Sequence, residues 1–172
     1  IYVDIISHSI EYESVKARLV LLNDITDQKN TQEQLRKLSL AVQQNPASIM
    51  ITDVNGIIEY VNPKFSILTG YEPHEVIGKN PRILKSGTTS PDEYDNLWKI
   101  ITSGRVWQGE FQNCKKNGEI YIESASISPI ADEYGTITHF IAVKEDITEK
   151  KRAEKLIKTL SRAIEQSPVS TM

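Results

Sequence analysis

Alternation of apolar with polar residues predicts the strands of this chain, and apolar spacings of three and four residues predict its helices. The strand-like stretches are 1–9, 16–23, 48–52, 57–61, 107–114, 119–129 and 136–144. The helical stretches are 27–44, two short segments after Asn62 and Glu72, 91–102 and 150–164. This order predicts an α+β fold, in which a five-stranded antiparallel sheet carries short helices on one face and is flanked by linker helices.

Capping residues predict where several helices begin and end. Asn62 stands before a proline and Gly70 stands seven residues after that proline, a pattern typical of one short helix with both ends marked. Ser90 and Glu93 have the spacing of a capping box at the start of the 91–102 helix. The buried stripe of that helix is predicted to be Tyr94, Leu97, Trp98 and Ile101.

The stretch 107–129 predicts a β-hairpin whose turn decides which side chains share a face. If residues 117–118 form a two-residue type I′ loop, Asn113 and Glu123 point to opposite faces. If residues 115–118 form a type I turn with Gly118 as a G1 bulge, Asn113 lies opposite Tyr121 and shares a face with Tyr121 and Glu123. A slip of one residue therefore separates a polar pocket from a solvated surface.

An internal repeat sets the domain organisation. The triplet Asp-Ile-Thr occurs at 24–26 and again at 146–148, and the stretch 38–46 resembles 160–168 at the same offset of 122 residues. The chain is thus predicted to hold the end of one module, a complete second module and the start of a third. The predicted boundaries are a C-terminal hairpin at 1–26, a linker helix at 27–46, a complete domain at 47–148, a linker helix at 149–166 and the next module's start at 167–172.

Both linker helices carry an apolar seam with spacings of three and four residues. The seam positions are Leu35, Leu38 and Val42 in the first helix and Ile157, Leu160 and Ile164 in the second. Such a seam suits a short parallel coiled coil between two subunits, and it equally suits a helix that packs on its own module. The hairpin at 1–25 should likewise expose an apolar face.

Composition limits the kinds of partner that the chain is expected to bind. With 25% charged residues and a net charge of −3, the chain has no basic stripe of the kind that nucleic-acid binding favours. One cysteine, Cys114, precludes an intrachain disulfide, and no apolar run approaches the roughly 20 residues of a membrane span. These features predict a cytoplasmic stretch without membrane contact, and the mid-strand start predicts a piece of a longer protein.

With these elements in place, residues 47–148 resemble a PAS sensory domain. The motifs that carry the resemblance are at 51–53, 60–62, 69–71, 78–80, 107–110, 117–118, 127–129 and 146–148. The ends 1–25 and 156–172 look like parts of neighbouring PAS domains. The resemblance implies an array of PAS domains in a two-component sensor histidine kinase with its phosphorelay, or in a diguanylate cyclase. It also implies a homodimer and kinase-type effector domains as partners.

In detail, residues 47–148 are similar to flavin-binding redox PAS domains. Light-sensing LOV domains place a reactive cysteine where this chain has Pro81, so the resemblance excludes LOV photochemistry. The flavin of the family, FAD or FMN, would lie against Asn80, Trp98, Trp107, Asn113, Tyr121, Glu123 and Lys144. The resemblance also favours the bulged turn, because it places Asn113 and Glu123 on the inner face. The 91–102 helix has no histidine, so haem is not expected.

Glu123 and Lys144 also have an explanation that needs no ligand. If the 132–135 loop closes with Ala131 facing Thr136, Glu123 and Lys144 are direct cross-strand neighbours and form an inward ion pair. The three histidines stand singly, without metal-ligand spacing, and no nucleophile–base pair is evident. The sequence therefore predicts a non-catalytic module, which either senses redox state or a small molecule, or dimerises and spaces its neighbours without a ligand.

Overall fold

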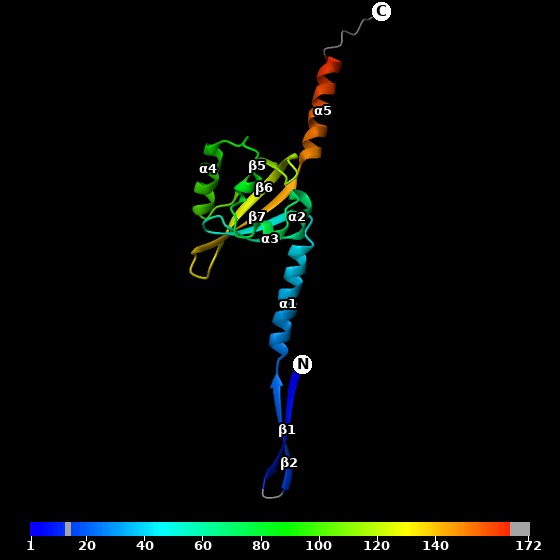
Figure 1. Ribbon diagram of the computed structural model, residues 1–172, viewed down its shortest axis with the longest axis vertical. Coiled ribbons are helices and arrows are strands. Elements are labelled where there is room, and N and C mark those ends of the chain that lie inside the picture. Colours follow the sequence, from blue (N-terminus) through cyan, green and yellow to red (C-terminus); the bar gives the residue numbers. More distant parts are fainter. Residues whose placement is uncertain (13–14, 166–172) are drawn as a thin grey trace, which may run out of the picture. The chain divides into compact units, whose positions relative to one another are not determined.

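A computed structural model describes residues 1–12 and 15–165, which fall into two compact units, one covering Ile1–Val42 and one beginning at Gln43. The second unit contains a five-stranded sheet (Figure 1). Its strands are β3 (Ser48–Asp53), β4 (Ile58–Val61), β5 (Trp107–Cys114), β6 (Ile120–Ala131) and β7 (Ile137–Asp146). Their order is β4-β3-β7-β6-β5 and every neighbouring pair is antiparallel, so the predicted sheet is confirmed.

Helices on one face of this sheet connect β4 to β5 (Figure 1). They are α2 (Pro63–Thr69), α3 (Pro73–Val76), the 3₁₀ helix η1 (Pro81–Leu84) and α4 (Pro91–Thr102). The predicted ends are confirmed, since the Asn62 side chain accepts from the backbone N–H of Phe65 and Gly70 adopts a left-handed conformation. Ser90 and Glu93 form the predicted capping box of α4. The helix η1 was not predicted.

The core lies between these helices and the inner face of the sheet, in two adjoining clusters. One cluster joins α2 and α3 to β3 and β4 and includes Met50, Phe65 and Val76. The other joins α4 to β5 and β6 and includes Leu97, Ile101, Trp107 and Phe111. Of the predicted α4 stripe, Leu97 and Ile101 are fully buried, while Tyr94 and Trp98 pack at the edge of the second cluster.

The first unit consists of the hairpin β1 (Val3–Tyr12) and β2 (Val15–Asp24), followed by α1 (Thr26–Gln43). Its apolar side chains are exposed as predicted, among them Ile5 and Leu22. Its pairing register, with Val3 opposite Asp24, differs by two residues from the one that the repeat would copy from β6 and β7. The β6–β7 turn has Asp132 and Gly135, whereas the sequence positions that the repeat makes equivalent hold Ile10 and Glu13.

The same capping arrangement starts both linker helices, α1 and α5 (Thr148–Glu165). In each, the aspartate Oδ1 of the Asp-Ile-Thr triplet accepts a 2.9 Å hydrogen bond from the threonine backbone N–H. The predicted start of a further module at 167–172 lies outside the described residues. No helix in the described ranges is long and apolar enough to span a membrane.

Candidate functional site

A cavity of about 390 Å³ lies between the helical segments and the inner face of the sheet. Apolar and aromatic side chains form most of its wall. Its polar lining consists of Thr52, three amides and three cations, and no aspartate or glutamate is among the described lining residues. The amides are Asn55, Asn80 and Asn113, and the cations are Arg82, Lys85 and Lys144. Its size suits a small organic molecule.

The hairpin turn beside the cavity is the bulged one. The Lys115 backbone N–H donates to the Glu119 carbonyl (2.8 Å), and the Gly118 N–H donates to the Lys115 carbonyl (2.9 Å). Gly118 has a φ of 89°, which is the left-handed conformation of a G1 bulge. Asn113 consequently lies opposite Tyr121. The prediction that Asn113, Tyr121 and Glu123 share the inner face is therefore confirmed.

Glu123 is the centre of a buried polar cluster. Its Oε1 accepts hydrogen bonds from Lys144 Nζ (2.6 Å) and Asn113 Nδ2 (2.9 Å), and its Oε2 accepts one from the Tyr121 hydroxyl (3.1 Å). The side chains of Glu123 and Lys144 are 1% and 6% exposed. Burial, together with the nearby Glu123 carboxylate, raises the pKa of Tyr121 well above its ordinary value. Tyr121 is thus a fixed hydrogen-bond donor rather than an acid.

The predicted ion pair between Glu123 and Lys144 is confirmed, but its predicted geometry is wrong. Lys144 lies opposite Ala125, and Glu123 lies opposite Asp146, so the pair is diagonal across β6 and β7. The cause is the turn at 132–135. Asp132, rather than Ala131, closes it, because the Asp132 side chain accepts from the N–H groups of Tyr134 and Thr136. A bulge between Ile130 and Ala131 shifts the register by one more residue.

Charged side chains from η1 and the segment after it lie at another part of the cavity wall. Asn80 Nδ2 donates to the Gly56 carbonyl (3.1 Å), and Asn80 Oδ1 accepts from Arg82 Nε (3.2 Å). Lys85 Nζ lies 3.4 Å from the centroid of the Tyr94 ring, a cation–π contact. The backbone of Lys85 forms a bridge to Asn113. Sequence reasoning missed Arg82 and Lys85, because a 3₁₀ turn has no apolar periodicity to reveal it.

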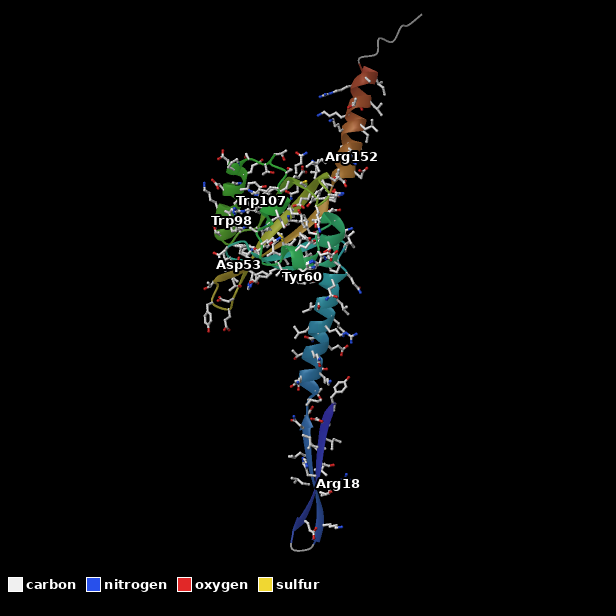
Figure 2. All side chains as sticks on the ribbon, in the orientation of Figure 1. Arg18, Asp53, Tyr60, Trp98, Trp107 and Arg152 are labelled. Carbon is white, nitrogen blue, oxygen red and sulfur yellow. The ribbon has the colours of Figure 1, made fainter. Side chains whose placement is uncertain are left out.

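Aromatic rings form the wall beside α4 and β5. Phe111 stacks on Tyr94 with ring centroids 5.8 Å apart and on Trp107 at 4.9 Å. Trp98 meets Phe140 edge-on at 5.7 Å. Trp98 and Trp107 lie in the same part of the domain (Figure 2). Phe111 was also missed, although alternation along β5 places it on the face of Asn113.

The seven residues predicted for a cofactor fall into two groups. Asn80, Trp98, Asn113 and Lys144 line the cavity. Trp107, Tyr121 and Glu123 are buried but stand behind the lining residues, where they support Phe111, Asn113 and Lys144. Contact of any of the seven with a cofactor stays a prediction. Cys114, next to Asn113 on β5, is not a lining residue, as its opposite direction along the strand predicts.

The strand that carries Lys144 leads directly into α5. Asp146 and Thr148 form the cap of this helix, and Thr148 Oγ1 accepts from the backbone N–H of Ile122 in β6 (2.9 Å). Lys151 in α5 pairs with Glu110 in β5 (2.7 Å), which raises the pKa of Lys151. The first turn of α5 is thus bonded to both strands of the hairpin that bears the polar cluster.

The described residues contain no group of histidine, cysteine and acidic side chains that could hold a metal ion. The site offers amide, ammonium and guanidinium groups at fixed places around an apolar body. That arrangement can bind and orient a small molecule.

Comparisons with known proteins agree with this geometry. Residues 46–149 match the family model described as "PAS domain". The "Nitrogen fixation regulatory protein" of Klebsiella oxytoca is 31% identical over 107 residues, which are 62% of this chain and 22% of that protein. The "Blue-light-activated histidine kinase" of Brucella anthropi is 32% identical over 120 residues, which are 67% of this chain and 24% of that protein. The chain thus spans about a quarter of the length of these relatives.

Among solved structures, an "RNA-binding Light-Oxygen-Voltage Receptor" is similar with a TM-score of 0.69 and 26% sequence identity. The similarity covers 77% of this chain and 39% of that one.

Proposed function

Because this chain belongs to the PAS domain family, we propose that residues 47–148 sense a signal and relay it through the linker helices. The whole protein would be a multi-PAS signalling protein of the sensor histidine kinase type, and the signal a redox change or a small molecule. The observation that carries the proposal is the place of Lys144. It lines the cavity, it pairs with buried Glu123, and it stands two residues before the Asp146 that caps α5.

The relay would begin when a ligand changes the hydrogen bonds of Lys144 or Asn113. Both side chains bond Glu123, so a shift in either one would move the inner face of β6 and β7. Those strands hold the first turn of α5 through Thr148, and β5 holds it through Glu110. A change at the cavity would therefore alter the stability or direction of α5, which is the two-state element that such a relay needs.

A flavin is the first cofactor to test, since a blue-light-activated kinase and a Light-Oxygen-Voltage receptor are among the similar proteins. The residues present fit it. Lys144 and Asn113 would hold the oxygen- and nitrogen-bearing edge of the ring, and Trp98 and Phe111 would lie against its apolar part. When bound, a flavin would supply reversible redox chemistry. With Pro81 in the cavity wall, no cysteine side chain stands at that position to form an adduct.

The visible absorption spectrum of the purified protein tests the cofactor. Flavin bands that are lost in N113A and retained in a Cys114→Ala variant would support a flavin held by this cavity. A colourless protein that gains no absorption after incubation with FMN or FAD would reject the flavin and leave a colourless small molecule as the signal.

The relay is tested separately in the full-length protein. Insertion of one alanine after Lys151 rotates everything beyond it by about 100° around the α5 axis. Altered signal dependence of the downstream output, restored by insertion of seven residues, would support transmission through helix phase. Unchanged output would reject it.

A second candidate is a ligandless module that dimerises and spaces its neighbours. It is favoured by the polar cluster, in which the Glu123 carboxylate is already bonded by three protein donors. Both candidates include a homodimer through the seams of α1 and α5, and a cytoplasmic location. They allow a histidine kinase or a diguanylate cyclase as the effector, and neither assigns catalysis to this stretch.

A further inference from the structure

The buried pair Glu123–Lys144 is hard to explain by stability alone. Moving two charges out of water costs free energy that their mutual attraction only partly returns, and apolar residues of similar volume often serve a fold equally well or better. Both side chains are almost completely buried, and the cavity wall to which Lys144 contributes is otherwise mainly apolar. Their presence therefore needs another reason.

The repeat supplies an internal comparison. At the offset of 122 residues, the positions of Glu123 and Lys144 correspond to Ile1 and Leu22. The correspondence has structural support, because both copies run from a hairpin through the same Asp-Ile-Thr cap into a helix of 18 residues. The first copy thus has apolar residues at these two sequence positions, although its register differs and Leu22 lies opposite Ile5 rather than against Ile1. The ion pair belongs to the second copy and not to the architecture as such.

The surroundings of Lys144 indicate what the pair could recognise. Lys144 lines the cavity whereas Glu123 does not. An ammonium group has three N–H donors, and among the described residues Lys144 Nζ donates to Glu123 Oε1. Directly opposite Lys144 in β3, Ser48 is 1% exposed and its Oγ has no hydrogen-bond partner among the described residues, but Ser48 is not a lining residue of the cavity. At the cavity wall, Lys144 therefore keeps N–H donors beyond the one that Glu123 accepts.

From these observations we infer that Glu123 and Lys144 determine ligand specificity, by presenting an ammonium donor whose charge is already balanced. At this position such a donor selects a neutral carbonyl oxygen on an otherwise apolar molecule, because a second anion would lie beside the Glu123 carboxylate, and the other two cations of the lining, Arg82 and Lys85, lie at another part of the wall. The copy with Ile1 and Leu22 lacks this donor and would not share the ligand. The inference rests on the proposed binding function of the cavity and adds the ligand's chemical class.

A pair of probes that differ in one carbonyl group tests this inference on the 172-residue chain. The probes are 2-acetylnaphthalene, which has the carbonyl oxygen, and 2-ethylnaphthalene, which has nearly the same shape without it. Binding is followed by quenching of tryptophan fluorescence, since Trp98 lines the cavity. The quantity compared is the ratio of the two dissociation constants, so that differences in probe hydrophobicity cancel between protein variants.

The variant E123I/K144L installs the residue pair of the first copy, and E123Q/K144M replaces the charges with side chains of similar length. The control variant K115L/E119I removes the ion pair at the tip of the same hairpin, where Lys115 Nζ and Glu119 Oε1 are 3.0 Å apart and neither residue lines the cavity. A hydrogen bond from a charged donor changes the ratio by about tenfold or more.

We expect wild type and K115L/E119I to share one ratio and E123I/K144L to lose about tenfold of the preference for the ketone. A ratio equal in wild type and in both cavity variants would overturn the inference, as would a chain that binds neither probe. A preserved preference for the ketone in wild type, without any change in α5 on binding, would count against the proposed relay alone.

Discussion

At the scale of single residues, the buried polar cluster around Glu123 distinguishes the interior of this domain from a purely apolar core. Glu123 receives three donors, so its charge is tolerated in the core. Replacing Lys144 alone would leave the buried charge of Glu123 without its cation. Replacing both Glu123 and Lys144 would leave no buried charge. The difference between these two outcomes can be measured as stability.

The single variant K144L is expected to lower the free energy of unfolding by about 3–5 kcal/mol, because Glu123 stays buried without its cation. The double variant E123I/K144L should recover most of that loss, since apolar pairs replace buried ion pairs at little cost. Urea unfolding followed by tryptophan fluorescence measures both. If the double variant were as unstable as the single one, the cost would come from lost packing around Lys144 and not from its charge.

A second residue-scale prediction concerns pH. Lys116 Nζ hydrogen-bonds both oxygens of Glu75 (2.6 and 2.7 Å), and this contact, more than the backbone N–H of Glu72, lowers the pKa of the Glu75 carboxyl. A lowered folded-state pKa means that the contribution to stability is present above the ordinary carboxyl pKa. It is lost as the pH falls through the lowered value.

The variant K116M should raise the pKa of Glu75 towards its ordinary value, which a ¹³C NMR titration of the Glu75 carboxyl carbon measures directly. K115M, which removes the neighbouring lysine with a different partner, should leave that titration unchanged. Equal Glu75 titrations in K116M and wild type would show that the contact is absent in solution.

At the scale of elements, turns decide the registers, and registers decide which side chains meet. The 115–118 turn was predicted because the family resemblance required Asn113 on the inner face, and the structure agrees. The 132–135 turn was mispredicted because an aspartate side chain can close a turn one residue later than the hydrophobic alternation suggests. Alternation fixes the face of a residue, but a shift in turn closure changes its partner.

The left-handed conformation of Gly118 gives a prediction for this turn. A Cβ added there would have no atom within 4 Å, so the cost of a side chain is confined to the backbone. G118A should lose about 1–2 kcal/mol of unfolding free energy, and G118N less, since asparagine visits this conformation more readily. Thermal or urea unfolding of both variants measures the difference. An equal cost for the two would show that the turn is held by side-chain crowding instead.

The strands, caps and helix face of the domain could be predicted from sequence because they depend on local patterns such as Asn62 and Ser90. Four of the seven candidate site residues, which the family resemblance indicated, line the cavity. Arg82 and Lys85 escaped prediction because their position depends on η1, a single 3₁₀ turn. The diagonal contact of Glu123 with Lys144 escaped because bulges carry no clear sequence signal.

At the scale of the whole molecule, both linker helices leave apolar side chains uncovered. Leu38 in α1 and Leu160 in α5, which correspond to each other in the repeat, are 65% and 54% exposed. Exposed leucines at repeated three- and four-residue spacing are typical of a seam that pairs with another helix. The exposed seams support the proposed intersubunit coiled coil.

The variant L38E/L160E should therefore convert a dimer of the 172-residue chain to a monomer, because like charges would face each other in both seams. Sedimentation equilibrium measures the molecular mass. K37E/K155E, which introduces glutamates at other exposed positions of the same two helices, is the control and should remain dimeric. A wild-type chain that sediments as a monomer at high concentration would contradict the seam.

The duplicated Asp-Ile-Thr cap has a consequence for protein engineering. In both copies the threonine at the helix start precedes the first seam residue, Leu35 or Ile157, by nine positions. A recombination junction placed within the triplet would thus exchange α1 and α5 between these two copies and keep nine positions between the threonine and the first seam residue. Chimeric proteins joined at 24–26 or 146–148 should keep the signal dependence of the proposed output. Junctions a few residues inside the helix should change it.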